Sequence, residues 1–429
     1  MDKQRILLIG TGGREHAMAW KMAQSPWLEE LIIAGGNPGM AVLGECVDLD
    51  VSDPDQVIRF CKKRSVSLVV VGPEQPLVDG LVDALEEADI AAFGPRMDAA
   101  RLEGSKEFAK AFMEKYQIPT AAHRTFPIEE AGEALSWIRE QNRYPVVLKA
   151  DGLAAGKGVF ICETEAEADA RLQQLAEDPA LSSAAANVVV EEFMDGEEAS
   201  VFVLSDGYTA RTLHNAQDHK RAGDGDTGLN TGGMGAYCPA PVVTSELLEE
   251  IERRIIQPTI TGMQIEESPY KGILYVGLMI TDEGPKVVEY NCRFGDPECQ
   301  VILPALKNDL IELIMSCEEE RLDEKEIELE SDTYCCVVVA SGGYPQAYEK
   351  GKSITGLDKV DEQTLIFHAG TRIDGSLLVT NGGRVLNVIG RGATLKEAID
   401  HVYQNVGKVS FDGSFYRSDI GKKGLARLA

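Results

Sequence analysis

Residues 285–300 read PKVVEYNCRFGDPECQ, and this stretch constrains the fold more than any other part of the chain. Its β-branched valines predict a strand, and the alternation of side chains along a strand puts Glu289 and Asn291 on one face and Tyr290 on the other. A carboxylate and an amide oxygen held together on a rigid strand suit a hard cation such as Mg²⁺ or Mn²⁺, which takes further ligands from phosphate and water. We therefore expect a metal-binding strand beside a nucleotide. The alternative is the solvated face of an edge strand.

A charged turn follows this strand directly. Arg293, Asp296 and Glu298 are spaced by Gly295 and Pro297, two residues that favour a sharp turn. Polar and charged groups therefore converge at the end of a buried strand, which favours a binding site over a solvated surface.

The length and charge of the chain restrict its class. A chain of 429 residues is too long for one core and predicts several domains. A net charge of −28 argues against a surface for nucleic acid or anionic membrane, because such surfaces rely on Lys and Arg. No apolar run approaches membrane-spanning length, and residues 1–10 are too short for a signal peptide. Nine cysteines without a CxxC pair fit a reducing compartment, so we expect a cytoplasmic protein.

The first hundred residues alternate short apolar strands with helices, which predicts a small parallel sheet of the doubly wound type. The expected strands are 4–10, 31–34, 67–71 and 90–93, and the expected helices are one that follows the first strand and ends near residue 27, one at 54–64 and one at 77–87. Glycine- and proline-rich turns follow three of these strands, at the edge where such sheets bind ligands. The turn GTGGREHA lacks the third glycine of a dinucleotide fingerprint, because Glu15 takes its place, so phosphate is a better candidate than NAD.

A helical pattern at residues 98–116 is divided by Ser105, which can cap its second half and leaves Lys106 in the first turn. A lysine there opposes the helix dipole, which indicates either solvent exposure or a bound phosphate.

A glycine-rich loop joins two predicted strands, 145–150 and 159–162. It reads DGLAAGKG and contains Gly152, Gly156, Lys157 and Gly158, and Lys149 lies near the end of the strand before it. Backbone N–H groups and lysine charge together suit a lid over phosphates. A P-loop would lead into a helix, whereas this loop leads into a strand. The alternative is a glycine-rich hairpin without a function.

Residues 214–237 contain Asp218, Lys220 and Arg221 before a glycine-dense run, and we expect a mobile active-site loop, with a low-complexity linker as the alternative. A long helix at 245–266 and a strand pair at 272–281 and 286–293 follow. A helix around 301–317 and a charged linker at 318–330 come next. Short strands at 333–340, 364–369, 376–380 and 384–390 and one helix at 395–405 then predict a small mixed domain.

The segment RFGDPE at residues 293–298, with Gln300 two places on, resembles the signature of the phosphoribosylamine-glycine ligase family of the ATP-grasp superfamily. The resemblance extends from the first strand to about residue 421. It implies an α/β and α+β multidomain fold: an N-terminal parallel αβ (pre-ATP-grasp) domain at 1–104, a central ATP-grasp domain at 105–326 and a small mixed C-terminal domain at 327–429. It also implies ligation of glycine to 5-phosphoribosylamine with ATP, through a glycyl phosphate, in purine (IMP) biosynthesis, with Mg²⁺ or Mn²⁺.

The resemblance also implies roles for individual residues. The expected ATP contacts are Lys106, Lys149, Lys157, Gly156, Gly158, Glu191, Phe193 and Glu198, with Glu191 and the residues after it at the adenine and Glu198 at the ribose. The expected metal ligands are Glu289 and Asn291, and the expected catalytic residues are Arg293 and Lys220. The expected substrate contacts are Gly12, Gly13, Asn37, Pro38, Gly39, Glu74, Asp218 and Arg293.

Two rival functions remain at this point. One is a related ATP-grasp ligase acting on another phosphoribosyl amine, formate or bicarbonate, against which the complete RFGDPE segment argues. The other is a nucleotide-sensing protein without turnover, against which Lys149, Lys157, Glu289 and Asn291 argue. We expect a monomer.

Overall fold

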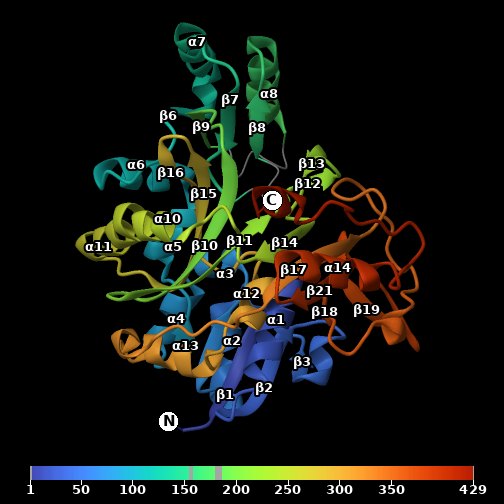
Figure 1. The fold of residues 1–429 in the computed structure, drawn as a ribbon. Coiled ribbons are helices and arrows are strands. Elements are labelled where there is room, and N and C mark those ends of the chain that lie inside the picture. The colour runs from blue at the N-terminus through green and yellow to red at the C-terminus, as the bar shows by residue number, and fades with distance from the viewer. Residues whose placement is uncertain (1, 154–157, 179–185, 429) are drawn as a thin grey trace.

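The computed structural model describes residues 2–153, 158–178 and 186–428. Gly156 and Lys157 lie outside these residues, so their predicted roles are not addressed by the structure. Figure 1 shows a lower body, a lobe that stands above it, and a C-terminal part beside them. No helix in the described part of the chain combines the length and hydrophobicity that a membrane span requires.

The N-terminal sheet is parallel, as predicted. It consists of β1 (Gln4–Gly10), β2 (Leu28–Gly35), β3 (Glu45–Val47), β4 (Leu68–Val71) and β5 (Ala91–Phe93), in the order β3-β2-β1-β4-β5. Residues 6–9 of β1 and 68–70 of β4 are almost fully buried, because helices cover both faces of a parallel sheet. These helices are α1 (Gly13–Met22), α2 (Pro54–Arg64), α3 (Glu74–Val78), α4 (Leu81–Glu87) and α5 (Met97–Gly104).

Two predicted helices in this region differ from the structure. The first ends at Met22 and not near residue 27, because turns follow its C-cap Ala23. The helix expected at 77–87 is divided into α3 and α4 at Gly80, whose φ of +83° only glycine adopts without strain. The break at Ser105 is confirmed: its side chain accepts a hydrogen bond from the Phe108 N–H at 3.1 Å and begins α6 (Lys106–Lys115).

The upper lobe holds the lid sheet, which consists of β6 (His123–Pro127), β7 (Val146–Ala150), β8 (Val159–Cys162) and β9 (Asn187–Glu192) in the order β6-β9-β7-β8. The two strands predicted on either side of the glycine-rich loop are β7 and β8, and they pair antiparallel. Helices α7 (Ala131–Gln141) and α8 (Glu165–Glu177) pack on this sheet and give the lobe its own hydrophobic core (Figure 1).

The central sheet crosses the whole molecule, in the order β16-β15-β10-β11-β14-β17-β21-β18. Its strands are β10 (Glu197–Asp206), β11 (Ala210–Asp218), β14 (Gly235–Cys238), β15 (Lys271–Thr281), β16 (Gly284–Asn291), β17 (Thr333–Ala340), β18 (Leu365–His368) and β21 (Arg384–Gly392). It therefore joins strands from both sides of the predicted boundary at residue 327. Helix α10 (Ser245–Ile251), a π-helical turn (Glu252–Ile256) and α11 (Gln257–Ile265) form the long helix expected at 245–266.

The prediction of a loop over residues 214–237 is wrong. Strand β11 runs to Asp218, β12 (Arg221–Gly223) and β13 (Thr227–Asn230) form a hairpin, and β14 is a buried strand of the central sheet. Small residues are needed in β14 for close packing: a Cβ at Gly235 would lie 2.5 Å from the Cys336 carbonyl oxygen. Glycine content therefore reflects tight packing here.

The C-terminal half also corrects the sequence reading. Two helices, α12 (Cys299–Ala305) and α13 (Leu310–Glu318), replace the one expected at 301–317. Strand β19 (Thr371–Asp374) was not expected, and it pairs with β20 (Leu377–Thr380). Helix α14 (Leu395–Val406) is followed by a further helix, α15 (Lys422–Leu428), where a single helix was expected.

The segment before α15 holds the β12–β13 hairpin in place. Arg417 is 2% exposed, and its guanidinium pairs with Asp226 at 2.9 Å and with Asp419 at 2.7 Å. It also donates to the Arg221 main-chain oxygen at 3.0 Å. A buried ion pair of this kind fixes the relative position of the two segments, because breaking it leaves charge without compensation.

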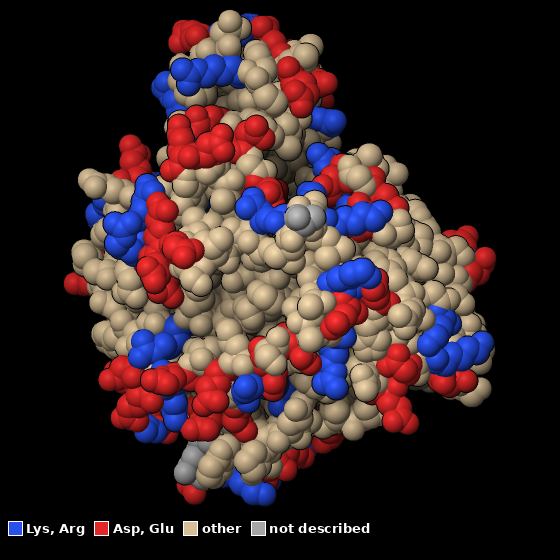
Figure 2. All heavy atoms as spheres, viewed as in Figure 1, with Lys and Arg blue, Asp and Glu red and all other residues tan. Residues whose placement is uncertain are grey.

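Figure 2 shows acidic and basic side chains interspersed over the visible face, with acidic groups gathered on the lower body and below the upper lobe.

Arg417→Met is expected to destabilise the protein by about 3 kcal/mol, because Asp226 and Asp419 lose a buried partner. Urea unfolding measures this, and limited proteolysis should show faster cleavage in the β12–β13 hairpin. The matched control is Lys396→Met, which removes an exposed i,i+4 pair with Asp400 and is expected to cost under about 0.5 kcal/mol. Equal stability of the two variants would contradict a stabilising role for the buried ion pairs of Arg417.

Candidate nucleotide and metal site

A cavity of about 1670 Å³ lies where the N-terminal sheet, the lid sheet and the central sheet meet. Its walls collect most of the described residues that the sequence singled out. They are Gly12, Glu74, Lys106, Lys149, Gly158, Glu191, Phe193, Glu198, Asp218, Lys220, Glu289, Asn291 and Arg293. Residues as far apart in sequence as Gly12 and Arg293 therefore line one cavity.

The strand β16 presents Glu289 and Asn291 to this cavity on one face, as predicted. Glu289 lies opposite Gly277 and Asn291 opposite Tyr275 on β15. Tyr290 points the other way, is 2% exposed, and its hydroxyl lies 2.8 Å from that of Thr259. Burial by itself would raise the pKa of Glu289, but Lys220, Lys149 and Lys106 lower it to about 2, so the carboxylate is ionised at neutral pH.

The residues of β16 fit a divalent cation. Nowhere in the described residues do three or more His, Cys, Asp or Glu side chains gather as a metal site. The protein thus offers one ionised carboxylate and one amide oxygen side by side, and a cation held there needs further oxygens from a phosphate ligand. That donor set is typical of Mg²⁺ and Mn²⁺ at nucleotide sites.

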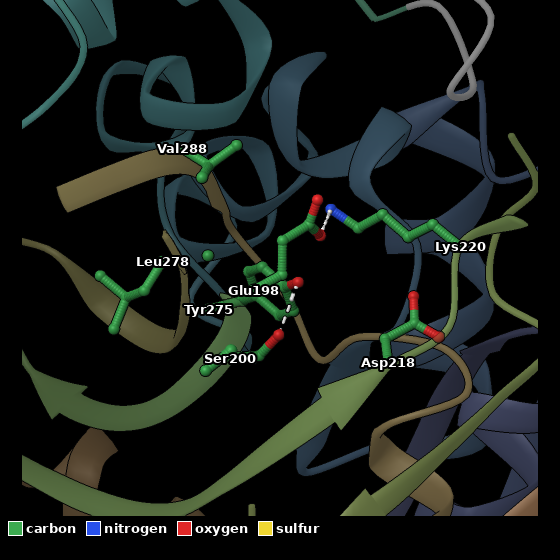
Figure 3. Close-up of a pocket in the computed structure, with 9 residues that line it drawn as sticks. Glu198, Ser200, Asp218, Lys220, Tyr275, Leu278 and Val288 are labelled. Carbon is green, nitrogen blue, oxygen red and sulfur yellow. Dashed lines mark hydrogen bonds and ion pairs between the residues drawn. The ribbon is translucent and has the colours of Figure 1, made fainter. Parts of the chain in front are cut away.

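Three lysines surround this strand. The Lys149 Nζ donates to the Val288 carbonyl oxygen on β16 at 3.0 Å, and the Lys106 Nζ donates to the Gly152 carbonyl oxygen at 2.9 Å. The Lys220 Nζ lies 3.0 Å from Glu198 Oε2 and 3.5 Å from Glu289 Oε1. Figure 3 shows Lys220 reaching across its pocket to Glu198, with Asp218 on the neighbouring wall. These positive groups can hold the phosphates of a nucleotide in an otherwise acidic protein.

Lys110 belongs to this site, and the sequence analysis missed it. Its Nζ lies 3.1 Å from Glu191 Oε2, while Lys149 takes Glu191 Oε1 at 3.0 Å, and all three side chains are nearly fully buried. Lys110 also donates to the Thr120 hydroxyl at 2.8 Å, which donates to the Val287 carbonyl oxygen on β16. Burial lowers the pKa of Lys110 to about 8. Its spacing of four residues from Lys106, which puts both on one helix face, was the available signal.

The charged turn after β16 packs against the N-terminal sheet. Arg293 lies 3.1 Å from Glu74 and 2.9 Å from Glu103, and the two carboxylates raise its pKa although burial opposes them. Arg14 of α1 donates to the Phe294 carbonyl oxygen at 3.0 Å. Arg293 and Glu74 are thus brought together as expected, and Arg14 and Glu103 are partners that sequence reasoning did not find.

The anion site expected at the N-terminus of α1 is occupied by the protein's own carboxylates. Glu15 Oε2 accepts from the Gly12 N–H at 2.7 Å, and Asp296 Oδ2 accepts from the Arg14 N–H at 3.1 Å. Negative charge at this position is favourable for the same reason that a phosphate would be. Glu15, which replaces the third glycine of a dinucleotide turn, therefore has a structural role.

Four of the expected substrate contacts do not line the cavity in the described structure: Gly13, Asn37, Pro38 and Gly39. The Asn37 amide donates to the carbonyl oxygens of Thr11 at 3.0 Å and His368 at 2.9 Å, and its oxygen accepts from the Gly39 N–H at 3.0 Å. Asn37 therefore ties β1 to β18. Gly13 allows α1 to approach β21, because a Cβ there would collide with Asn387.

Three family models match the chain along its length. The N domain of phosphoribosylglycinamide synthetase matches residues 4–103, its ATP-grasp (A) domain matches 104–299, and its C domain matches 334–423.

Full-length relatives carry the name phosphoribosylamine–glycine ligase. The protein from Agrobacterium fabrum is 50% identical over 423 residues, covering 99% of both chains, and that from Vibrio parahaemolyticus is 48% identical over 427 residues, also covering 99% of both.

Solved structures agree with these matches. The phosphoribosylamine–glycine ligase of Thermotoga maritima superposes with a TM-score of 0.83 at 35% identity, covering 97% of this chain and 100% of that one. A biotin carboxylase domain from Hydrogenobacter thermophilus, solved with MgADP and bicarbonate, has a TM-score of 0.71 at 14% identity over 100% of this chain and 99% of that one, which shows a shared fold. The chain therefore belongs to the phosphoribosylamine–glycine ligase family and has its N-terminal parallel domain, ATP-grasp domain and C-terminal domain.

Proposed function

We infer that this chain joins glycine to 5-phosphoribosylamine with the hydrolysis of ATP to ADP and phosphate, forming glycinamide ribonucleotide in de novo purine biosynthesis. One observation carries the inference beyond family membership: Glu289 and Asn291 face Lys106, Lys149 and Lys220 across a single cavity. This arrangement suits transfer of a phosphoryl group, and the described site has no need of a protein nucleophile.

The chemistry of amide formation explains this arrangement. A carboxylate is a poor electrophile, so its oxygen first attacks the γ-phosphorus of ATP and the bond to ADP breaks, giving glycyl phosphate. The sugar amine then attacks the carbonyl carbon, the carbon–oxygen bond to phosphate breaks, and the amine releases a proton. Because both steps are displacements on bound partners, alignment and compensation of phosphate charge supply most of the rate enhancement.

Different residues of the cavity wall perform these tasks. Lys106 and Lys149, with Gly158 on the wall of the same cavity, bind the phosphates of ATP, while Phe193 and the main chain after Glu191 receive the adenine and Glu198 the ribose. Glu289 and Asn291 hold the metal, which supplies charge compensation for the phosphates when it is bound. Lys220 lies between the ribose and metal sides. Gly12, Glu74 and Arg293 line the N-terminal edge, where the phosphoribosyl group fits.

Further features of this function stay predictions. The oxygen ligands of β16 support Mg²⁺, with Mn²⁺ as the alternative. We expect a cytoplasmic monomer that acts on small-molecule substrates and has neither nucleic acid nor membrane as a partner.

The order of steps is tested with glycine that carries oxygen-18 in its carboxylate. In a reaction with ATP and phosphoribosylamine generated in place, one labelled oxygen is expected in each released phosphate, because the carboxylate oxygen stays with phosphorus. Mass spectrometry of the phosphate measures this. Phosphate without label would exclude the glycyl phosphate route.

Glu289→Gln is expected to lower turnover by at least about a hundredfold at limiting Mg²⁺, because an amide is a much weaker ligand than a carboxylate. Steady-state ADP release measures it, and a thermal melt checks that the fold is kept. Glu283→Gln, at the exposed turn before β16, is the matched control and should match the wild type. Normal Mg²⁺ dependence in Glu289→Gln would remove Glu289 from the metal site.

Lys110→Met is expected to raise the KM for ATP about tenfold or more, since Glu191 and Lys149 lose the partner that positions them. Lys110→Arg should restore part of this loss, and the KM for glycine should change little. Lys115→Met, at the exposed end of the same helix, serves as control. An unchanged KM for ATP in a folded Lys110→Met protein would show that the lysine acts on stability alone.

A further inference from the structure

The cavity wall includes α15, a helix to which the proposed function gives no role. Its residues Lys423, Ala426 and Arg427 line the cavity. The Arg427 guanidinium pairs with Glu197 Oε1 at 2.7 Å. Glu197 is the first residue of β10 and directly precedes Glu198, the expected ribose contact. Helix α15 therefore lies against the strand end that would receive the ribose.

A second connection between α15 and β10 runs through buried side chains. The Gly424 N–H donates to the Tyr237 hydroxyl oxygen, and this hydroxyl donates to Gln217 Oε1. The Gln217 Nε2 then donates to the main-chain carbonyl oxygen of Glu198 at 2.7 Å. A Cβ at Gly424 would lie 2.8 Å from the Tyr237 hydroxyl oxygen, so the helix is packed closely on the tyrosine. We call these three consecutive hydrogen bonds the relay.

The relay supplies a contact that the central sheet lacks at this place. The pairing of β10 with β11 ends at Ser200 and Ala216, before Glu198 is reached, and the Gln217 amide holds the strand end instead. Gln217 lies directly opposite Tyr237 on β14, and both side chains are almost fully buried. Burial raises the pKa of Tyr237, so its hydroxyl keeps its proton and can donate. Removing one member would leave its neighbour buried without a partner, so the relay forms as a unit.

The relay and Lys220 together determine how Glu198 points. The Lys220 Nζ holds the Glu198 carboxylate at 3.0 Å from the cavity side (Figure 3), while the relay holds the main chain of the same residue from the core. A carboxylate accepts from both hydroxyls of a ribose only when both of its oxygens face them. That orientation depends on the position of the main chain, and small displacements weaken such a contact.

We propose that Tyr237 and Gln217 are positioning residues that direct Glu198 to the ribose of ATP, and that α15 completes the nucleotide site by joining this relay. The inference rests on the proposed function, in which Glu198 binds the ribose. Neither positioning residue acts on the reacting atoms. Their effect is on the affinity and selectivity for the nucleotide, and it links α15 to a residue more than two hundred positions earlier in the chain.

Tyr237→Phe keeps the ring and removes the hydroxyl. Its Kd for MgATP, measured by titration calorimetry, should rise about threefold to tenfold, the usual effect of one lost hydrogen bond. The Kd for 2′,3′-dideoxy-ATP should hardly change, because this analogue lacks both hydroxyls, so the preference for ATP falls by the same factor. The KM values for glycine and phosphoribosylamine should stay within about twofold of wild type. The matched control is Tyr334→Phe, a buried tyrosine of β17 bonded to Arg391, which lies outside the described cavity wall.

Gln217→Met removes the next member of the relay and keeps the length of the side chain. It should produce the same rise in the Kd for ATP and the same loss of preference over the dideoxy analogue. The double variant should bind ATP within about twofold of the weaker single variant, because members of one hydrogen-bonded chain are not additive. Two independent effects would multiply instead, and that result would contradict the relay.

The assignment would be overturned by a folded Tyr237→Phe protein that binds both nucleotides like the wild type, or that loses affinity for both equally. A wild type that does not prefer ATP to the dideoxy analogue would overturn it as well. Should Tyr237→Phe not fold, Gln217→Met decides by the same criteria. If the wild type binds ATP selectively but releases no ADP with glycine and phosphoribosylamine, the proposed ligase function fails while the relay stands.

Discussion

The site depends on one buried charge cluster, in which Lys149 and Lys110 hold the two oxygens of Glu191 at 3.0 and 3.1 Å. Its members come from β7, α6 and β9, and the two lysines also bond to the main chain of β16, directly or through Thr120. Isolated charges in such a place would be very costly, so the lid sheet, α6 and β16 have to meet in one arrangement. The cluster thereby sets the distance between the lid sheet and β16.

The other sheets of the fold contribute further side chains to the same cavity. The carboxyl edge of the parallel N-terminal sheet brings Gly12 and Glu74, as such sheets generally do for their ligands. The central sheet brings Asp218 and Glu289 from strands that are separated by β10 and β15. C-terminal strands extend this sheet, and the segment around Arg417 secures the β12–β13 hairpin at the cavity. Each part therefore contributes one wall, and none of them contains the site alone.

The cavity holds several positively charged side chains, although the molecule as a whole is strongly acidic. The chain carries a net charge of −28, yet two of its proposed substrates, ATP and phosphoribosylamine, carry phosphate groups. Arg293, Lys149 and Lys220 are each held by carboxylates, so their positive groups are fixed in place before a ligand arrives. Preorganised charge of this kind is more effective in catalysis than mobile surface lysines, because little reorganisation is needed when the phosphate binds.

The sequence by itself determined those features that depend only on residues close to one another in the chain. Strand alternation placed Glu289 and Asn291 on one face, the cap at Ser105 set the start of α6, and the RFGDPE segment identified the family. Tertiary structure alone decided the rest. Residues 235–238 are a buried strand because β17, about a hundred residues later, pairs with them. Lys110 and Glu103 join the site through partners on other elements, and the α1 turn that resembles a phosphate site is filled by Glu15 and Asp296. Local patterns specify the direction of a side chain, whereas its partner depends on long-range packing that brings distant segments together.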